Sequence, residues 1–313
     1  MPLKPLHTLE SMTSDDYAEA WLPGPHSTQF YTRTYLVPGG TLSKAAMVFV
    51  HGFTEHIGRY TEVHAEFARR GINVFAYDQR GFGKTALDEE HGSGRAAYGK
   101  TDVEKQMDDV EWALTHTHTA FPSLPLFLSG HSMGGGETLN FVVRRPDAVT
   151  SLGLRGVIPC SPLILTTSPS PYLRFWTAEK EATGEDPYAH TDTSRKVQHP
   201  GLTHDAAYNE MSKHDTLREP YGTVRHMSQM LEWGDDLFNS NYTKWPSTLP
   251  ILIVHGSDDL LTSHDAARML IEKLPAVDKK FTSYPDGRHE LVHEPAHGQA
   301  MVDEIVGFIE GRI

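Results

Sequence analysis

Short, almost wholly apolar runs alternate along the chain with stretches in which apolar residues recur at helical spacing. Runs short enough to be strands buried on both faces of a sheet lie at 46–50, 72–77, 126–128, 152–158 and 251–254. Period-two alternation adds a strand within 28–37, and a last short run lies at 281–284. The pattern therefore predicts a sheet whose strands come from most of the chain.

Helical patterns separate these runs. Four apolar residues stand four, three and four positions apart, like one face of a helix: Val103, Met107, Val110 and Leu114. Further helices are expected at 134–145, 266–274 and 298–309. Repetition of strand and helix, with strands apolar on both sides, predicts an α/β fold. We expect a mostly parallel sheet of about eight strands, covered by helices on both faces.

One long segment breaks this alternation between Cys160 and about Ser247, where Pro, Thr, His and charged residues dominate. It is too long to be a loop in a compact domain, so we expect an inserted helical cap. Short helices are predicted within it near 204–213 and 222–237. The predicted division is an N-terminal extension, a core in two pieces and the cap, at 1–27, 28–161 with 247–313, and 162–246.

The sequence Gly130-His131-Ser132-Met133-Gly134 matches the pattern G-x-S-x-G. The bare pattern is common, but here it directly follows a predicted strand and opens a predicted helix. That context predicts a nucleophile elbow, a tight turn that presents the serine hydroxyl above the sheet. The alternative is a glycine-rich turn without a catalytic role. We interpret His131, which precedes the serine, as a structural residue.

A nucleophilic serine needs a base to take its proton and an acid to orient that base. After an elbow the acid is expected at the end of a later strand, and the base in a loop after the last strand. Asp258 and Asp259 both follow the strand at 251–254, and periodicity does not separate them. His289 lies in the expected loop, with His293 and His297 as rivals nearer the C-terminal helix.

Composition narrows the classes of partner. A formal net charge of −13 over 313 residues argues against binding to nucleic acid and to anionic lipid surfaces. No apolar run approaches the ~20 residues of a membrane-spanning helix. The single cysteine, Cys160, and the lack of a secretory signal favour a cytoplasmic protein. There is no cysteine cluster, and no metal and no cofactor are expected, although the pattern H-E-x-x-H occurs at 289–293 and again at 293–297.

Several segments resemble the monoacylglycerol lipases of the α/β-hydrolase fold, a family of serine hydrolases that includes fungal, yeast-like members. The similarity covers roughly residues 47–161 and 249 to the C-terminus. It rests on four motifs: HGFTEHIGRY at 51–60, DQRGFG at 78–83, GHSMGGG at 130–136 and CSPL at 160–163.

The resemblance implies a catalytic triad of Ser132, Asp259 and His289. It places the oxyanion hole on the backbone N–H groups of Phe53 and Met133. It also implies hydrolysis of monoacylglycerols to a fatty acid and glycerol through an acyl-enzyme, without a cofactor.

The cap matches the family poorly, at about 165–220, and it is the part expected to select the substrate. Apolar residues at its entrance are candidates for substrate binding: Leu163, Ile164, Leu165, Phe175 and Trp176. We expect Phe175 and Trp176 to aid access to substrate in a membrane or lipid droplet. The alternative is ordinary packing of the cap onto the core.

Two other functions remain open. The first is a broader carboxylesterase, a lysophospholipase or an aminopeptidase on the same scaffold. The second is a ligand-binding protein that keeps the fold without chemistry, which the presence of Ser132, Asp259 and His289 disfavours. A serine at the elbow disfavours haloalkane dehalogenases and epoxide hydrolases, which need a carboxylate nucleophile.

Overall fold

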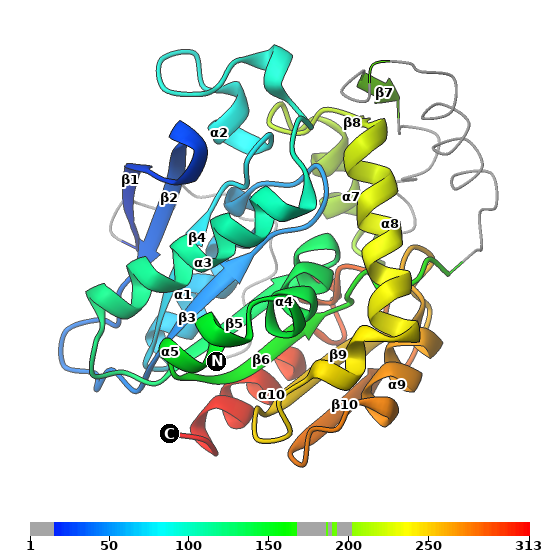
Figure 1. Cartoon of the computed structure of the whole chain (residues 1–313). Coiled ribbons are helices and arrows are strands. Elements are labelled where there is room, and N and C mark those ends of the chain that lie inside the picture. The colour runs from blue at the N-terminus through cyan, green and yellow to red at the C-terminus, as the bar shows by residue number, and fades with distance from the viewer. Residues whose placement is uncertain (1–15, 168–185, 187–189, 193–201) are drawn as a thin grey trace.

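The computed structural model describes residues 16–167, 186, 190–192 and 202–313, and its central feature is one eight-stranded sheet (Figure 1). The strands lie in the order β1-β2-β4-β3-β5-β6-β9-β10. Their bounds are β1 (Ala18–Pro23), β2 (Gln29–Tyr35), β3 (Ala45–Val50), β4 (Ile72–Tyr77), β5 (Leu126–His131), β6 (Leu154–Cys160), β9 (Ile251–Gly256) and β10 (Lys279–Tyr284). β1 and β2 pair antiparallel to their neighbours, and the other strands are parallel. The predicted mostly parallel sheet is confirmed.

Helices cover both faces of this sheet, as predicted. Their bounds are α1 (Thr61–Arg69), α2 (Gly83–Leu87), α3 (Val103–Ala120), α4 (Met133–Arg144), α5 (Pro146–Ser151), α7 (Ala206–Lys213), α8 (Val224–Asn239), α9 (His264–Lys273) and α10 (Gly298–Glu310). Short 3-10 turns add η1 (Pro25–Ser27), η2 (Ile57–Tyr60), η3 (Arg95–Ala97), η5 (Asn241–Lys244) and η6 (Leu291–His293). A separate antiparallel pair consists of β7 (His190–Asp192) and β8 (Tyr221–Thr223).

Two apolar cores result, one on each face of the sheet. Phe127 points into the core shared with α1 and α10, and Leu128 points into the core shared with α3, α4 and α9. Both side chains are fully buried. Successive strand residues face opposite sides, so a strand covered on both sides is apolar at every position.

β1 was not identified from the sequence and lies within 1–27, the predicted N-terminal extension. It is an edge strand that pairs only with β2, with Ala18 opposite Thr34 and Pro23 opposite Gln29. Most of its side chains are exposed. It therefore lacks the continuous apolar run that marks the buried strands.

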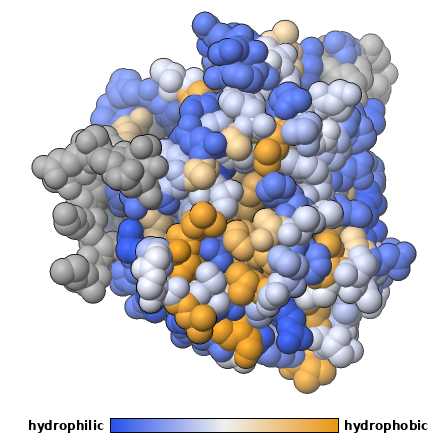
Figure 2. Space-filling view, turned by 90° about the vertical axis from the view of Figure 1, so that its left-hand side faces the viewer, coloured by the Kyte–Doolittle hydropathy of each residue, from blue (hydrophilic) through white to orange (hydrophobic). Residues whose placement is uncertain are grey.

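The face of the molecule on the β1 side carries both hydrophobic and hydrophilic residues. Figure 2 shows hydrophobic residues gathered in the lower half of this face and mostly hydrophilic residues in the upper half. Exposed apolar side chains of the protein include Leu36 and Leu42, both in the connection from β2 to β3. In the described part of the chain, no helix combines the length and apolar character needed to cross a membrane.

The parallel register brings the functional loops to one edge of the sheet. Val50 pairs with Gly130, His131 with Cys160, and Gly256 with Tyr284, all at the carboxyl ends of their strands. Loops that follow these strands therefore meet above the same edge, where α/β proteins place their sites.

The two helices predicted within the insertion are present as α7 and α8, and α8 runs beside α4 at the right of Figure 1. Nε2 of His226 on α8 lies 3.0 Å from Oε1 of Gln106 on α3. Burial lowers the pKa of His226 to about 4. An unfolded histidine titrates near pH ~6.5. Between these two values only the unfolded chain takes up the proton, so stability falls as pH falls through that window.

We expect His226→Leu to flatten the decline of unfolding free energy between pH 6.5 and 4, because this proton uptake is removed. The difference in slope should reach roughly 1.4 kcal/mol per pH unit. Urea unfolding at several pH values measures it. His214→Gln is the matched control, because the His214 side chain is 78% exposed. An unchanged slope in His226→Leu would contradict the assignment of a buried neutral ring.

Candidate active site

Ser132 occupies a strained turn between β5 and α4. Its φ of 56° and ψ of −118° lie where residues with a Cβ are rare. A Cβ added to Gly134 would stand 2.2 Å from the carbonyl oxygen of Val50, and one added to Gly130 would stand 2.5 Å from that of Gly134. Both glycines are therefore needed for the close approach of α4 to β5 and β3. The geometry is that of the predicted nucleophile elbow.

The structure brings together the three side chains predicted to form the triad. Nε2 of His289 lies 2.9 Å from Oγ of Ser132, and Nδ1 lies 2.8 Å from Oδ2 of Asp259. The imidazole thus stands between hydroxyl and carboxylate, within hydrogen-bond reach of both. Asp259 and His289 are almost fully buried. This arrangement can take a proton from the serine and stabilise the charge that the imidazole gains.

The two acidic candidates differ in environment. Oδ1 of Asp259 accepts hydrogen bonds from the backbone N–H groups of Leu261 and Thr262, at 2.8 and 3.0 Å. The side chain of Asp258 is 55% exposed, with a carboxylate oxygen 3.9 Å from Nε of Arg288. Burial alone would raise the pKa of Asp259, but His289 and the other hydrogen-bond donors hold it well below its usual range. Only Asp259 is placed as an ionised partner of His289.

The rival histidines lie apart from the serine. His293 stacks on Tyr208 with ring centroids 3.7 Å apart, and burial lowers the pKa of His293 to about 4. Nε2 of His297 lies 2.8 Å from the carbonyl oxygen of Pro285. Both rings therefore take part in packing or hydrogen bonding that does not involve Ser132. The sequence alone did not distinguish them from His289.

The two backbone groups predicted for the oxyanion hole flank the elbow. Met133 is the first residue of α4, where N–H groups have no acceptor within the helix. Phe53 follows Gly52, and a Cβ added to Gly52 would stand 3.1 Å from Cβ of Ser132. The loop after β3 thus passes beside the serine. This placement is compatible with a pair of donors, and their role stays a prediction.

A buried polar network behind the elbow was not predicted. Oε2 of Glu55 accepts hydrogen bonds from Gly52 N–H, at 2.9 Å, and from the Tyr60 hydroxyl. Burial opposes a charge on His131, but Glu55 outweighs it and raises the pKa of His131. The ring then donates from Nδ1 to the Tyr60 oxygen and from Nε2 to the carbonyl of His289, at 3.0 and 3.2 Å. His131 therefore ties the elbow to the loop of the base.

A buried ion pair extends this network toward helix α7. Arg59 donates from Nη2 to both carboxylate oxygens of Glu290, at 2.8 and 3.0 Å. It also donates from Nη1 to Oγ of Ser212 on α7, at 3.1 Å. Burial alone would raise the pKa of Glu290, but Arg59 reverses the effect and lowers it. Because Glu290 follows His289 directly, this pair holds the backbone next to His289 in place.

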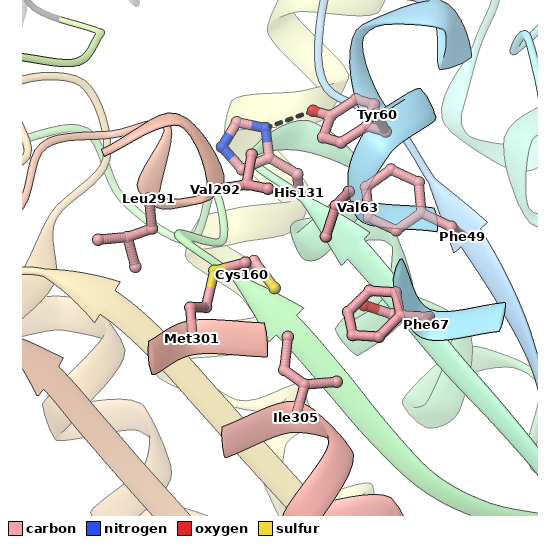
Figure 3. A pocket seen from close by; sticks show the side chains of 11 residues that line it. Phe49, Tyr60, Val63, Phe67, His131, Cys160, Leu291, Val292, Met301 and Ile305 are labelled. Atoms are coloured by element: carbon pink, nitrogen blue, oxygen red, sulfur yellow. Dashed lines mark hydrogen bonds between the residues drawn. The ribbon is translucent and has the colours of Figure 1, made fainter. Parts of the chain in front are cut away.

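A cavity lies beside His131, among apolar side chains of α1, α10 and η6 (Figure 3). Its volume is about 20 Å³, which is room for roughly one water molecule. Figure 3 shows Val63, Phe67, Met301 and Ile305 around it, with His131 and its hydrogen bond to Tyr60 at one end. The space is too small for an acyl chain, so we interpret it as a packing gap.

The residues predicted to bind substrate lie in different surroundings. Leu163 lines a second small cavity with Met133, Met230 and Trp233, next to the elbow. Ile164 is 2% exposed and belongs to the core, as ordinary packing predicts. The backbone carbonyl of Leu165 accepts a hydrogen bond from Ser263 N–H at 2.8 Å. Phe175 and Trp176 lie outside the described residues. Among the residues that are described, no group of three His, Cys, Asp or Glu side chains is arranged to hold a metal.

We expect Gly134→Ala to lower the unfolding free energy by roughly 1–3 kcal/mol, because the new methyl group meets the backbone of β3. It should also slow the reaction of Ser132 with a fluorophosphonate probe. Gly307→Ala on α10 is the control, because an added Cβ there meets nothing within 4 Å. That control should gain roughly 0.5–1 kcal/mol. Equal stability and labelling of both variants would contradict the close approach at Gly134.

Sequence comparisons connect this site to known proteins. Residues 41–296 match a family model described as serine aminopeptidase, S33. A putative monoglyceride lipase of Schizosaccharomyces pombe is 31% identical over 257 residues, which are 79% of this chain and 62% of that protein. The chain therefore spans less than two thirds of that relative. A monoglyceride lipase of Saccharomyces cerevisiae is 27% identical over 79% of this chain and 78% of that protein.

A solved structure supports the fold. A soluble variant of monoglyceride lipase from Saccharomyces cerevisiae, in complex with a substrate analog, matches with a TM-score of 0.80. The match has 24% sequence identity and covers 99% of this chain and 98% of that one. The predicted α/β-hydrolase fold and the resemblance to this group of lipases are confirmed. Since the family model covers most of its length, the chain belongs to the serine aminopeptidase S33 family of α/β-hydrolases.

Proposed function

We propose that the protein is a serine hydrolase that cleaves the ester bond of monoacylglycerols, with Ser132 as nucleophile, His289 as base and Asp259 as orienting acid. The observation that carries this proposal is the position of His289, 2.9 Å from the serine oxygen and 2.8 Å from the carboxylate. A general base must stand within such reach of the proton that it takes.

In the proposed cycle, His289 takes the proton of the Ser132 hydroxyl while the serine oxygen attacks the ester carbonyl. The carbonyl oxygen gains negative charge, and the N–H groups of Phe53 and Met133 donate to it. His289 then gives its proton to the departing glycerol oxygen, which leaves an acyl-enzyme. Water repeats the sequence to release the fatty acid, and Asp259 holds the tautomer of His289 in both halves.

The substrate class rests on two lines of support. The relatives from both yeasts are named monoglyceride lipases. In addition, the cavity next to the elbow, of about 20 Å³, is lined by the polar side chains of Gln106, Glu137 and Asn140 and, from the insertion and its entrance, by the apolar side chains of Leu163, Met230 and Trp233. An acyl chain needs an apolar lining to leave water.

We further propose that residues 162–246 form a cap over a core of 28–161 and 247–313, and that this cap selects the acyl chain. Its apolar entrance residues Leu163 and Leu165, together with Phe175 and Trp176, are proposed to bind the chain. We also propose that the enzyme works in the cytoplasm and contacts a membrane or lipid droplet through Phe175 and Trp176. The net charge of −13 leaves apolar contact as the means of such attachment.

Hydrolysis rates for glycerol esters with acyl chains of two to eighteen carbons test this assignment. We expect a monoacylglycerol with a long chain to be cleaved with a higher kcat/KM than a short-chain ester or a peptide, because only the long chain fills an apolar path. Ser132→Ala should lose at least roughly 10⁴-fold in rate and all fluorophosphonate labelling.

The alternatives predict other outcomes of the same assay. A preference for short esters would indicate a carboxylesterase, and cleavage of the peptide alone would indicate an aminopeptidase. A wild-type protein that neither labels nor hydrolyses any of these substrates would favour a ligand-binding protein. Each of these results would contradict the proposed function.

A further inference from the structure

A second histidine contacts the carboxylate that orients His289. His255 lies in β9 and is fully buried. Its Nε2 is 3.0 Å from Oδ2 of Asp259 and 3.2 Å from the carbonyl oxygen of Thr262. A carboxylate and a carbonyl only accept hydrogen bonds, so the proton of the ring belongs on Nε2. With the proton on Nδ1 alone, a lone pair would face two oxygens.

The other nitrogen of this ring argues for a neutral imidazole. Nδ1 of His255 is buried and has no hydrogen-bond partner among the described residues. A second proton there would leave an N–H group buried and unpaired, which is costly. His255 is therefore a neutral donor to Asp259.

Three donors converge on Oδ2 of Asp259. Nδ1 of His289 and Oγ1 of Thr262 each lie 2.8 Å from it, and Nε2 of His255 lies 3.0 Å from it. The Thr262 hydroxyl has a single proton and also lies 3.0 Å from the carbonyl of Ser161. The His255 N–H faces a carbonyl as well, but the carboxylate is nearer and is charged, which makes it the stronger acceptor.

We propose that His255 is a positioning residue of the reaction, whose Nε2–H holds Oδ2 of Asp259 toward His289 and lowers the basicity of that carboxylate. The inference rests on the proposed role of His289 as the base. Each hydrogen bond that a carboxylate accepts stabilises its charge and weakens its pull on another proton. With His255 in place, Asp259 favours the protonated form of His289 less, so the neutral, active form extends to lower pH.

Other ionisable groups lie near His255 and His289, namely His264 on α9, whose Nδ1 is 3.7 Å from the exposed carboxylate of Asp265, and His131 on β5, which pairs with Glu55. The ring centroid of His264 is 5.6 Å from that of His255, and its Nε2 lies 2.8 Å from Oγ of Ser283. His131 lies 4.7 Å from His289 between ring centroids and pairs with Glu55. None of these groups contributes a hydrogen bond to Asp259 within the described structure, and all of them are unchanged in the His255 variants.

The pH dependence of fluorophosphonate labelling tests the proposal, because the probe reports activation of Ser132 whatever the natural substrate is. In the full chain we expect His255→Leu to label roughly tenfold more slowly at pH 7, because even a small displacement of a catalytic group costs rate. The midpoint of its acid limb should move to higher pH. His255→Gln can donate from its amide, so it should recover most of the rate, with a midpoint between the other two.

His264→Gln is the matched control. It replaces a neighbouring ring that does not touch Asp259, and we expect its rate and midpoint to equal those of the wild type. Acid unfolding of a destabilised variant would also move the midpoint to higher pH, so the midpoints are compared only over the pH range in which circular dichroism shows every variant to be folded. A His255→Leu midpoint equal to that of the wild type would overturn the proposal.

Nitrogen-15 NMR of the wild-type protein gives a second readout that does not depend on the folding of a variant. We expect the His255 proton to reside on Nε2 while His289 titrates. A proton on Nδ1 of His255 would also overturn the proposal. Failure of the proposed function is distinguishable, because the wild type would then not label, or Ser132→Ala would label equally.

Discussion

The hydrogen-bonded line from Ser132 through His289 to Asp259 is the constraint on which the rest of the structure depends. Its side chains are separated by 157 and 30 positions in the sequence. They meet because β5 and β9 are parallel strands of one sheet and end at the same edge. The glycines around the serine and the strained φ of Ser132 are local consequences of presenting the hydroxyl there.

The buried charged side chains around Ser132, His289 and Asp259 are stabilised by hydrogen-bond partners. Asp259 accepts hydrogen bonds on both oxygens, and Glu290 beside the base is held by two bonds from Arg59. A buried ionised group without such partners would shift its pKa and lose its charge. In the network from Glu55 through His131 to the backbone of His289, a buried carboxylate likewise has a partner. We interpret it as the support that keeps the imidazole in place with little room to move.

Periodicity and local motifs predicted most of the core, since buried parallel strands are short apolar runs and β4 (Ile72–Tyr77) matches its predicted range. The elbow was predictable because a serine in a strand-to-helix turn is a local pattern. The choice of Asp259 over Asp258 was not derivable from periodicity and came from resemblance. The pair of Arg59 and Glu290 spans 231 positions and has no local signal. β1 was missed for a related reason, because an exposed edge strand needs no apolar run.

The most direct test of the central claim is a crystal structure of the protein after reaction with a long-chain alkyl phosphonate. The account predicts phosphorus bonded to Oγ of Ser132, with a phosphonyl oxygen within hydrogen-bond distance of the N–H groups of Phe53 and Met133. The imidazole of His289 should remain between the serine oxygen and Asp259. Phosphorus on another residue, or an oxygen turned away from both N–H groups, would contradict it.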